Sequence, residues 1–256
     1  MTDSDFDQGV ALVVGGSGGI GGAISEVFAK RGSNVAFTYL SNVERAEKVE
    51  ARVRAHGTKV SKHQLSLEDD DGIENLLKTL SEEHGKIHSI VYASGPSIKV
   101  GYVSKIGMAD WERVFRQDTH SCFNLVRLAL PVLKAQGGGS LTAVTTTQFH
   151  RPELMGVLSA APKAAIEMTF RAIAKESAQF GIRANIVRSG WVDAGMVDGS
   201  LDGQLQDKHY QALIADIPMR RFANPYEVAE AAVFMASNRA SFITGMSITA
   251  DGGMHL

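Results

Sequence analysis

Residues 10–22 read VALVVGGSGGIGG, a short apolar run that ends in a cluster of glycines. In the segment 20–30 that overlaps it, Ile24, Val27 and Phe28 are spaced to share one face of a helix. A strand, a glycine turn and a helix in this order hold a diphosphate in dinucleotide-binding folds, where the N–H groups and the positive dipole end of the helix face the anion. The segment therefore predicts a Rossmann-type fold with a phosphate site at its first turn.

Three glycines of this loop occupy the positions that such a turn requires. Gly15 permits the tight turn, Gly19 lets the backbone approach the phosphates, and Gly21 lets the helix pack against the strand. The cofactor contacts that we predict in the loop are Gly15, Ser17, Gly19, Ile20 and Gly21. A flexible surface turn is the alternative interpretation.

Apolar runs alternate with helical-period segments along the rest of the chain. Predicted strands cover 10–14, 34–39, 59–65, 87–93, 140–145, 183–188 and 246–249, and predicted helices cover 20–30, 43–56, 73–80, 108–134, 159–179 and 225–235. The alternation predicts an α/β protein with one doubly wound parallel sheet flanked by helices, in a single domain over 1–256. Segment 192–217, rich in Gly and Asp, breaks the alternation and is predicted to be a mobile substrate lid.

The composition excludes several classes of function. Lys and Arg number 26 against 28 Asp and Glu, so the chain offers no positive field for nucleic acid or an anionic membrane. Its one cysteine, Cys122, rules out an internal disulfide, and the scattered histidines predict no metal site. The acidic start is neither a secretory signal nor a transit peptide, and no apolar run approaches the roughly 20 residues that span a bilayer. We expect a cytoplasmic protein.

The end of the second predicted strand bears on the choice of cofactor. Residues 39–42 read YLSN, without the acidic residue that bonds the ribose 2′-hydroxyl in an NAD-preferring site. Ser41 and Asn42 are donors for a 2′-phosphate, and Arg45 is near in sequence. The sequence therefore favours NADP(H) over NAD(H). Ser41 and Glu44 also fit a capping box for the next helix, and the two roles are compatible.

Further motifs extend over almost the whole chain. Residues 14–21 (VGGSGGIG) are close to T-G-x-x-x-G-x-G, 92–95 (YASG) stand in the place of N-N-A-G, and 182–190 (IRANIVRSG) are similar to R-x-N-x-x-x-P-G. Two later stretches, 218–229 and 243–253, match P-x-x-R-x-x-x-P-x-E-V-A and a terminal signature with T-G and D-G-G. On these motifs the chain resembles the short-chain dehydrogenase/reductase family, in particular its ketoacyl-reductase-like branch.

The resemblance implies further contacts with a nicotinamide dinucleotide, on the segments after several strands and on the active-site helix. The residues at these family positions are Ser66, Leu67, Ala93, Ser94, Gly95, Lys163 and Val192. The resemblance also implies a small-molecule substrate and a homo-oligomer, a tetramer built through the helices 108–134 and 159–179.

The catalytic set of the family, Asn, Ser, Tyr and Lys, is altered in this chain. Lys163 matches the lysine, but the tyrosine four residues earlier is replaced by Ser159. The serine position holds Thr146, the asparagine position holds Asp118, and Ala194 replaces a threonine that touches the nicotinamide amide. A serine hydroxyl is far less acidic than a phenol, so the resident proton donor for carbonyl chemistry is missing.

Three substitutes for that donor stay open. The first is another acid that reaches the site, namely Tyr102, His150 or Tyr210. The second is Lys163 acting through Ser159 and a water molecule. The third is a substrate that needs no phenol, because hydride addition to an activated alkene leaves an enolate that water can protonate.

Ser159, Asp118 and Thr146 can also have purely structural roles. Ser159 suits a helix N-terminus, and Thr146 suits a strand end. Asp118 suits a buried polar group that bonds a backbone amide or water. Residues that we predict to lie in the core or at a subunit contact are Met155, Met168 and Phe170. Two functions therefore stay open. One is an NADP(H)-dependent oxidoreductase that transfers hydride to or from a small carbonyl, alcohol or activated alkene. The other is a catalytically silent dinucleotide- or ligand-binding protein or partner subunit.

Overall fold

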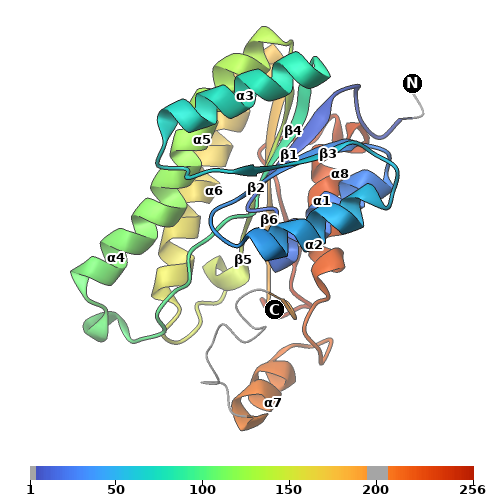
Figure 1. Ribbon diagram of the computed structural model, residues 1–256. Coiled ribbons are helices and arrows are strands. Elements are labelled where there is room, and N and C mark those ends of the chain that lie inside the picture. Colours follow the sequence, from blue (N-terminus) through green and yellow to red (C-terminus); the bar gives the residue numbers. More distant parts are fainter. Residues whose placement is uncertain (1–3, 195–206) are drawn as a thin grey trace.

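The computed structural model describes residues 4–194 and 207–256 (Figure 1). Within these residues seven parallel strands form one sheet in the order β3-β2-β1-β4-β5-β6-β7. The strands are β1 (Val10–Val14), β2 (Asn34–Tyr39), β3 (Val60–Gln64), β4 (Ile87–Tyr92), β5 (Gly139–Thr146), β6 (Ile182–Ser189) and β7 (Ser247–Ala250). The predicted α/β class and the doubly wound parallel sheet are confirmed, and the strand boundaries differ from the predicted ones by at most one residue.

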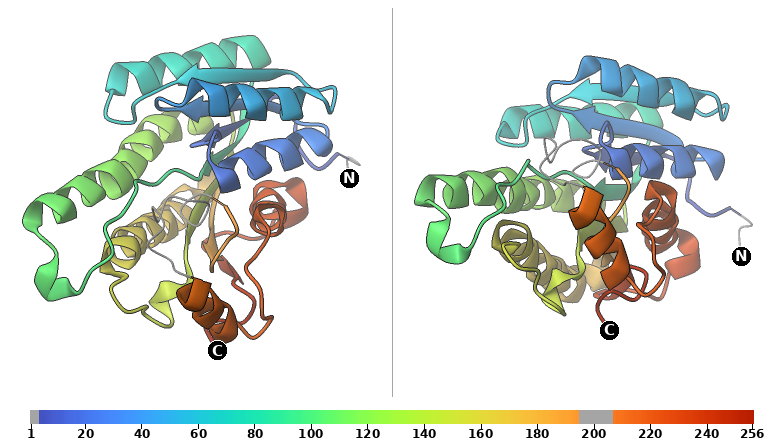
Figure 2. Two further views of the ribbon diagram at one scale, coloured as in Figure 1. Left: turned by 60° about the horizontal axis from the view of Figure 1, so that its bottom comes forward. Right: turned by 90° about the horizontal axis from the view of Figure 1, so that it is seen from below.

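Helices cover both faces of the sheet (Figures 1 and 2). One face carries α1 (Gly19–Lys30), α2 (Val43–Arg54) and α8 (Pro225–Ala236), and the other carries α3 (Asp70–His84), α5 (Ser121–Ala135) and α6 (Val157–Ser177). The remaining helical segments are α4 (Met108–Phe115), α7 (Asp207–Asp216), a π turn at Arg116–His120, and 3-10 turns at Val103–Lys105, Thr147–Phe149, Ala178–Phe180 and Asn238–Ala240. Across the described ranges, no helix combines the length and the apolar character needed to cross a membrane.

The first strand shows why the chain folds in this way. All five residues of β1 are buried, and because side chains alternate along a strand they enter two separate cores. Val10, Leu12 and Val14 join the cluster under α3, α5 and α6, whereas Ala11 and Val13 join the cluster under α1, α2 and α8. A continuous apolar run is what a parallel strand covered on both faces requires.

The strand order places the glycine loop at the switch point of the sheet. β1 pairs with β2 on one side and with β4 on the other, so the chain runs outward to β3 and then returns to the opposite side of β1. In doubly wound folds, ligands bind in the crevice at the carboxyl ends of the strands that flank such a point. Val14 at the end of β1 pairs with Tyr92 at the end of β4, so both strands reach this crevice together.

The helix predicted over 108–134 is confirmed in its extent. Helical residues run without interruption from Met108 to Ala135, as α4, the π turn and α5 (Figure 1). The prediction missed the π turn, in which the main-chain carbonyl of Asp118 accepts a hydrogen bond from the Tyr92 hydroxyl. Helical periodicity contains no signal for a contact of this kind.

The predicted lid over 192–217 is only partly described. Its last ten residues before Ile217 form α7, which packs through Tyr210 on Phe222. Residues 195–206 lie outside the described residues. The mobility of the lid therefore stays a prediction.

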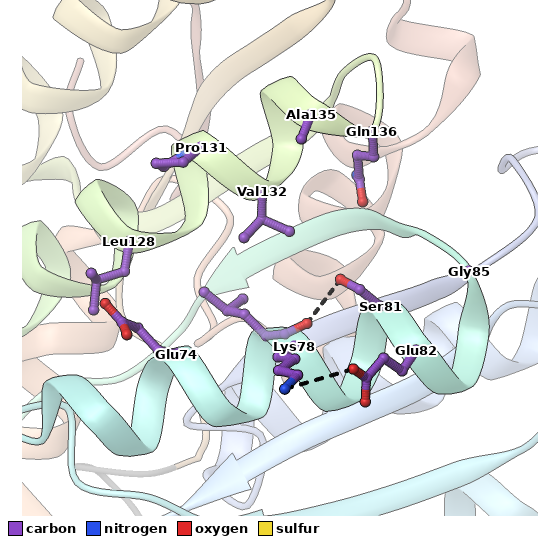
Figure 3. Close-up of a pocket in the computed structure, with 11 residues that line it drawn as sticks. Glu74, Lys78, Ser81, Glu82, Gly85, Leu128, Pro131, Val132, Ala135 and Gln136 are labelled. Carbon is purple, nitrogen blue, oxygen red and sulfur yellow. Dashed lines mark hydrogen bonds and ion pairs between the residues drawn. The ribbon is translucent and has the colours of Figure 1, made fainter.

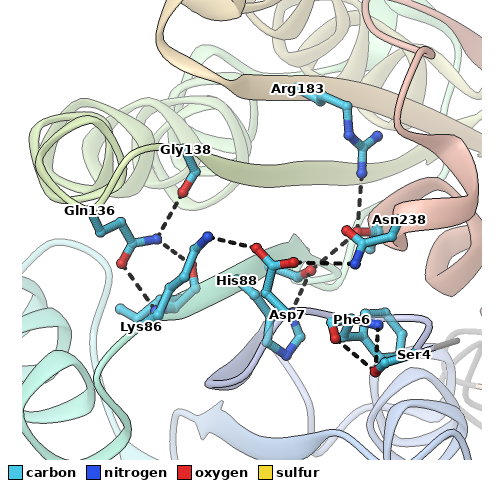
Figure 4. Close-up of polar contacts among 12 residues, drawn as sticks. Ser4, Phe6, Asp7, Lys86, His88, Gln136, Gly138, Arg183 and Asn238 are labelled. Atoms are coloured by element: carbon cyan, nitrogen blue, oxygen red, sulfur yellow. Dashed lines mark hydrogen bonds and ion pairs between the residues drawn. The ribbon is translucent and has the colours of Figure 1, made fainter. Parts of the chain in front are cut away.

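A polar cluster lies at the amino-terminal end of β4, opposite to the crevice (Figure 4). Lys86 pairs with Asp7 at 2.7 Å. Next to this pair, His88 stacks on Phe6 with ring centroids 5.1 Å apart, and its Nε2 lies 2.9 Å from the Ser33 hydroxyl. Burial lowers the pKa of His88 to about 4, because the charged imidazolium would lose its hydration there.

The buried imidazole predicts a loss of stability in acid. The folded-state pKa of His88 lies below the unfolded value of 6.5, so the unfolded chain takes up the proton first as the pH falls toward about 4. We expect this residue alone to lower the free energy of unfolding by about 2 kcal/mol between roughly pH 7.5 and pH 5. Urea unfolding at the two pH values measures the change, and a His88→Gln variant should lack it. The same pH dependence in the parent and in the variant would contradict this assignment.

Candidate cofactor site and active site

Particular glycines at the turn between β1 and α1 have no space for a side chain. Gly15 has a φ of +78°, and a Cβ there would lie 2.8 Å from the Cα of Ser94. A Cβ on Gly21 would lie 2.2 Å from the Gly15 carbonyl oxygen, so Gly21 packs on the turn itself. From the other side, the Thr38 hydroxyl of β2 accepts a hydrogen bond from the Gly15 N–H at 3.1 Å. Thr38 is a support of the loop that sequence reasoning missed.

The start of α1 suits an anion. Its N-cap residue, Gly18, provides no side-chain cap, and the first turn of the helix contains no acidic residue. The first N–H groups of a helix lack intrahelical partners and carry the positive end of the helix dipole. The residues that would hold the diphosphate of a dinucleotide are Ser17, Gly19, Ile20 and Gly21.

The segment after β4 lies between the glycine loop and Lys163. The Ala93 N–H donates to the Val14 carbonyl at 2.9 Å, which extends the contact between β1 and β4 up to the loop. A Cβ built on Gly95 would lie 3.7 Å from Lys163 Nζ. The structure therefore brings the glycine loop, residues 93–95 and Lys163 to one crevice.

Three other predicted cofactor residues lie along the same edge of the sheet. Ser66 and Leu67 follow β3, and the Leu67 carbonyl accepts from Asn124 of α5 at 3.0 Å. Val192 follows β6, is buried, and pairs with Ala223. All three come after strands whose carboxyl ends point toward the crevice.

The polar residues after β2 differ from the expected capping box. Asn42, not Ser41, is the N-cap of α2, and its Oδ1 accepts from the Arg45 N–H at 2.8 Å. Glu44 pairs instead with Lys48 at 2.7 Å. The reason is that the residue directly before the first helical turn reaches the N3 amide, and Asn is as good a cap as Ser. Ser41 and Asn42 are both exposed.

A buried ion pair lies at the candidate active site. Asp118 Oδ2 is 2.7 Å from Lys163 Nζ, and the two side chains are 1% and 16% exposed. Among the described residues, Asp118 Oδ1 has no hydrogen-bond partner. Asp118 is buried, as its structural alternative predicted, but its carboxylate pairs with an ammonium and not with a backbone amide. A carboxylate buried to this degree needs a cation beside it.

Two hydroxyl groups complete the candidate catalytic set. Ser159 is buried one helical turn before Lys163, so both side chains share a face of α6. Thr146 ends β5, and its Oγ1 accepts from the Gln148 N–H at 3.3 Å. In the described part of the chain, Gln148 Oε1 and Thr145 Oγ1 are buried without partners. Such atoms are usually satisfied by a ligand or by ordered water.

The three alternative proton donors have other surroundings. Tyr102 is 59% exposed on the loop after β4. The Tyr210 ring packs on Phe222 with centroids 4.7 Å apart, and His150 Nε2 faces the Arg188 guanidinium. As far as the structure describes the chain, none of the three donors hydrogen-bonds a member of the candidate catalytic set.

A surface groove between α3 and α5 is separate from this site (Figure 3). Leu77, Leu128 and Val132 supply apolar walls. The groove ends at Gln136, whose side chain bonds the main chain of Ile87 at the start of β4. It therefore lies toward the amino ends of the strands, away from the crevice. Within the residues described, no group of three or more His, Cys, Asp or Glu side chains could hold a metal ion.

Comparison with known proteins identifies the family. The sequence model of the family described as "Enoyl-(Acyl carrier protein) reductase" matches residues 14–255. The chain is 32% identical over 246 residues to the "Uncharacterized oxidoreductase YmfI" of Bacillus subtilis (strain 168), across 96% of this chain and 98% of that protein. It is 27% identical, with the same coverage, to the "3-oxoacyl-[acyl-carrier-protein] reductase FabG" of Staphylococcus aureus (strain N315).

A solved structure of a short-chain type dehydrogenase/reductase from Mycobacterium ulcerans has the same fold, with a TM-score of 0.89 and 21% identity over 98% of this chain and 91% of that one. The protein thus belongs to the short-chain dehydrogenase/reductase family of NAD(P)-dependent enzymes. Within that family it is an oxidoreductase of the short-chain type.

The steric constraint at the glycine turn predicts an unusual mutational response. Ala in place of Gly stabilises an open helix position by about 1 kcal/mol. For Gly21→Ala we expect the opposite, a loss of about 2 kcal/mol in the free energy of unfolding, because the new Cβ would overlap the Gly15 carbonyl. Urea unfolding measures the change. The control is Gly107→Ala at the N-cap of α4, where nothing lies within 4 Å of the added Cβ and only the smaller cost of a poorer cap residue is expected. A Gly21→Ala variant as stable as the parent would show that the turn is not closed in this way.

Proposed function

We propose that the chain is an NADP(H)-dependent oxidoreductase that transfers hydride between the nicotinamide ring and a small carbonyl, alcohol or activated alkene. One observation carries the proposal: the Gly15 turn, which leads into the uncapped start of α1, and the partly buried Lys163 both border the segment 93–95. A dinucleotide needs a diphosphate site and, at the other end of the same crevice, polar groups for the nicotinamide ribose. The bound cofactor would supply or accept the hydride.

The residues of the chain would bind and orient the two ligands. An ammonium has three N–H donors, and Lys163 directs one of them at Asp118, which leaves two for ribose hydroxyls. The hydroxyls of Thr146 and Ser159 can donate to a substrate oxygen that gains negative charge. Ala194 lacks the hydroxyl that the family pattern provides for the nicotinamide amide, so Val192 would contact that region through its backbone.

Of the three possible sources of the proton, the two that need no further acidic side chain are favoured. Tyr102, His150 and Tyr210 have other contacts or face solvent. A water bound near Ser159 and Lys163 can deliver the proton instead, or the substrate can be an activated alkene whose enolate is protonated by water. Both routes dispense with a phenol.

The preference for NADP(H) rests on the end of β2. Ser41 and Asn42 are exposed there and present donors, and the nearest carboxylate in sequence, Glu44, is paired with Lys48. An acidic residue that would repel a 2′-phosphate is absent from 39–42.

We also propose a homo-oligomer, a cytoplasmic tetramer built through α5 and α6. Phe123 of α5 and Met168 of α6 are 55% and 62% exposed. Exposed apolar side chains on the faces of long helices are typical of contacts with another subunit. Phe170, by contrast, lies in the core, and Met155 is exposed on the loop before α6.

Cofactor binding tests the proposal. We expect NADPH to bind more tightly than NADH, and Lys163→Ala to raise the Kd for NADPH by about tenfold, because charge-assisted hydrogen bonds to the ribose are lost. Fluorescence titration measures both constants. The control is Lys78→Ala, which removes an exposed lysine on α3. Failure of the parent to bind either dinucleotide would overturn the proposal.

Introducing the missing phenol tests the catalytic set. We expect Ser159→Tyr to raise the rate of NADPH oxidation by ketones by about a hundredfold, because a general acid is then available beside Lys163. Absorbance of NADPH, with a panel of ketones and enones, measures the rate. Ser159→Phe, which adds the ring without the hydroxyl, is the matched control. If NADPH binds but neither the parent nor Ser159→Tyr reduces any compound, the catalytically silent binding protein becomes the better description.

A further inference from the structure

Tyr92 ends β4 at the point where the sheet meets α5 and α6. Its side chain is almost wholly buried, and its hydroxyl donates to the main-chain carbonyl of Asp118 at 2.9 Å. Burial raises the pKa of Tyr92 well above its usual value, so the hydroxyl keeps its proton and stays a donor. A buried tyrosine hydroxyl needs a partner, and here that partner is a carbonyl in the π turn.

The π turn is held from two sides. Tyr92 contacts it from the sheet, and the Thr119 hydroxyl donates to the Pro162 carbonyl of α6 at 3.1 Å. Pro162 directly precedes Lys163. The two hydrogen bonds therefore set the position of the turn relative to the lysine. Turns of this kind depart from regular helical bonding and are frequent at functional sites.

The side chain of Asp118 connects the π turn to Lys163. Its Oδ2 accepts from Lys163 Nζ at 2.7 Å, and its side chain is only 1% exposed. One N–H of the ammonium is directed at Asp118, which fixes the rotation of the other two. Nζ lies beside Gly95, on the segment that borders the crevice.

We propose that Tyr92 is a positioning residue that, through the main chain and the carboxylate of Asp118, fixes the Lys163 ammonium for the nicotinamide ribose of a bound dinucleotide. This inference rests on the proposed function, because it assumes that a dinucleotide binds in the crevice. Tyr92 would touch neither cofactor nor substrate, since its ring lies in the core under α5 and α6.

Removal of one hydroxyl tests the link. Tyr92→Phe keeps the ring and loses only the hydrogen bond to Asp118. We expect the Kd for NADPH to rise about three- to tenfold, as the loss of one hydrogen bond implies. The Kd for adenosine 2′,5′-bisphosphate should stay unchanged, because this probe occupies only the adenine end of the site. An equal weakening of both ligands would indicate a general loss of structure and overturn the proposal.

A double variant tests the route through Asp118. Asp118→Ala removes the carboxylate but keeps the main-chain carbonyl to which Tyr92 donates. In that background, Tyr92→Phe should still lower the urea midpoint, yet it should leave the Kd for NADPH unchanged, because the connection to Lys163 is already broken. Additive effects of the two substitutions on this Kd would contradict the route.

Ser237→Ala is the matched control. It removes another buried hydroxyl, which donates to the Phe234 carbonyl at 2.7 Å at the end of α8. We expect a lower urea midpoint and no change in either Kd. If the parent protein binds neither NADPH nor NADH, both the proposed function and this inference are wrong. If the parent binds NADPH but Tyr92→Phe has the same Kd for it, only the role of Tyr92 is wrong.

Discussion

No side chain fits at Gly15 or Gly21, where β1 meets α1, and the arrangement of the crevice depends on this steric constraint. Gly21 lies so close to the Gly15 carbonyl that α1 begins directly against the end of β1. The start of the helix is therefore uncovered, and its N–H groups and dipole act on whatever anion enters. Because β1 lies between β2 and β4, the same turn borders the Thr38 hydroxyl on one side and residues 93–95 on the other.

The ion pairs of the structure contribute less to its stability than the burial of apolar side chains does. A buried ion pair adds little net stability, since desolvation offsets most of the attraction between its charges. Asp118 and Lys163 form such a pair near the crevice, and Glu167 and Arg188 form a second one between α6 and β6. Each pair connects two different elements: Asp118 in the π turn with Lys163 in α6, and Glu167 in α6 with Arg188 in β6.

The ion pair also changes the chemistry that the family pattern implies. A neutral asparagine would leave the full positive charge of Lys163 to the ligands, whereas the Asp118 carboxylate offsets it. Under the proposed function, this and Ser159 in place of a phenol would give a site with hydroxyl donors and an ammonium but without a strong acid. Such a site would suit the proposed hydride transfer with a proton that comes from water.

The sequence by itself determined the α/β class, the seven strands to within one residue, and the place of the glycine loop, because apolar runs and glycine spacing act over short distances. The family resemblance also predicted Asp118, Ser159 and Lys163 as site residues, a role that stays a prediction. Only the tertiary structure decided that Asp118 faces Lys163, that the helix over 108–134 contains a π turn to which Tyr92 donates, and that Thr38 accepts from the glycine loop. These contacts join residues that lie 23 to 45 positions apart, where no local pattern of polarity or backbone preference can specify a partner.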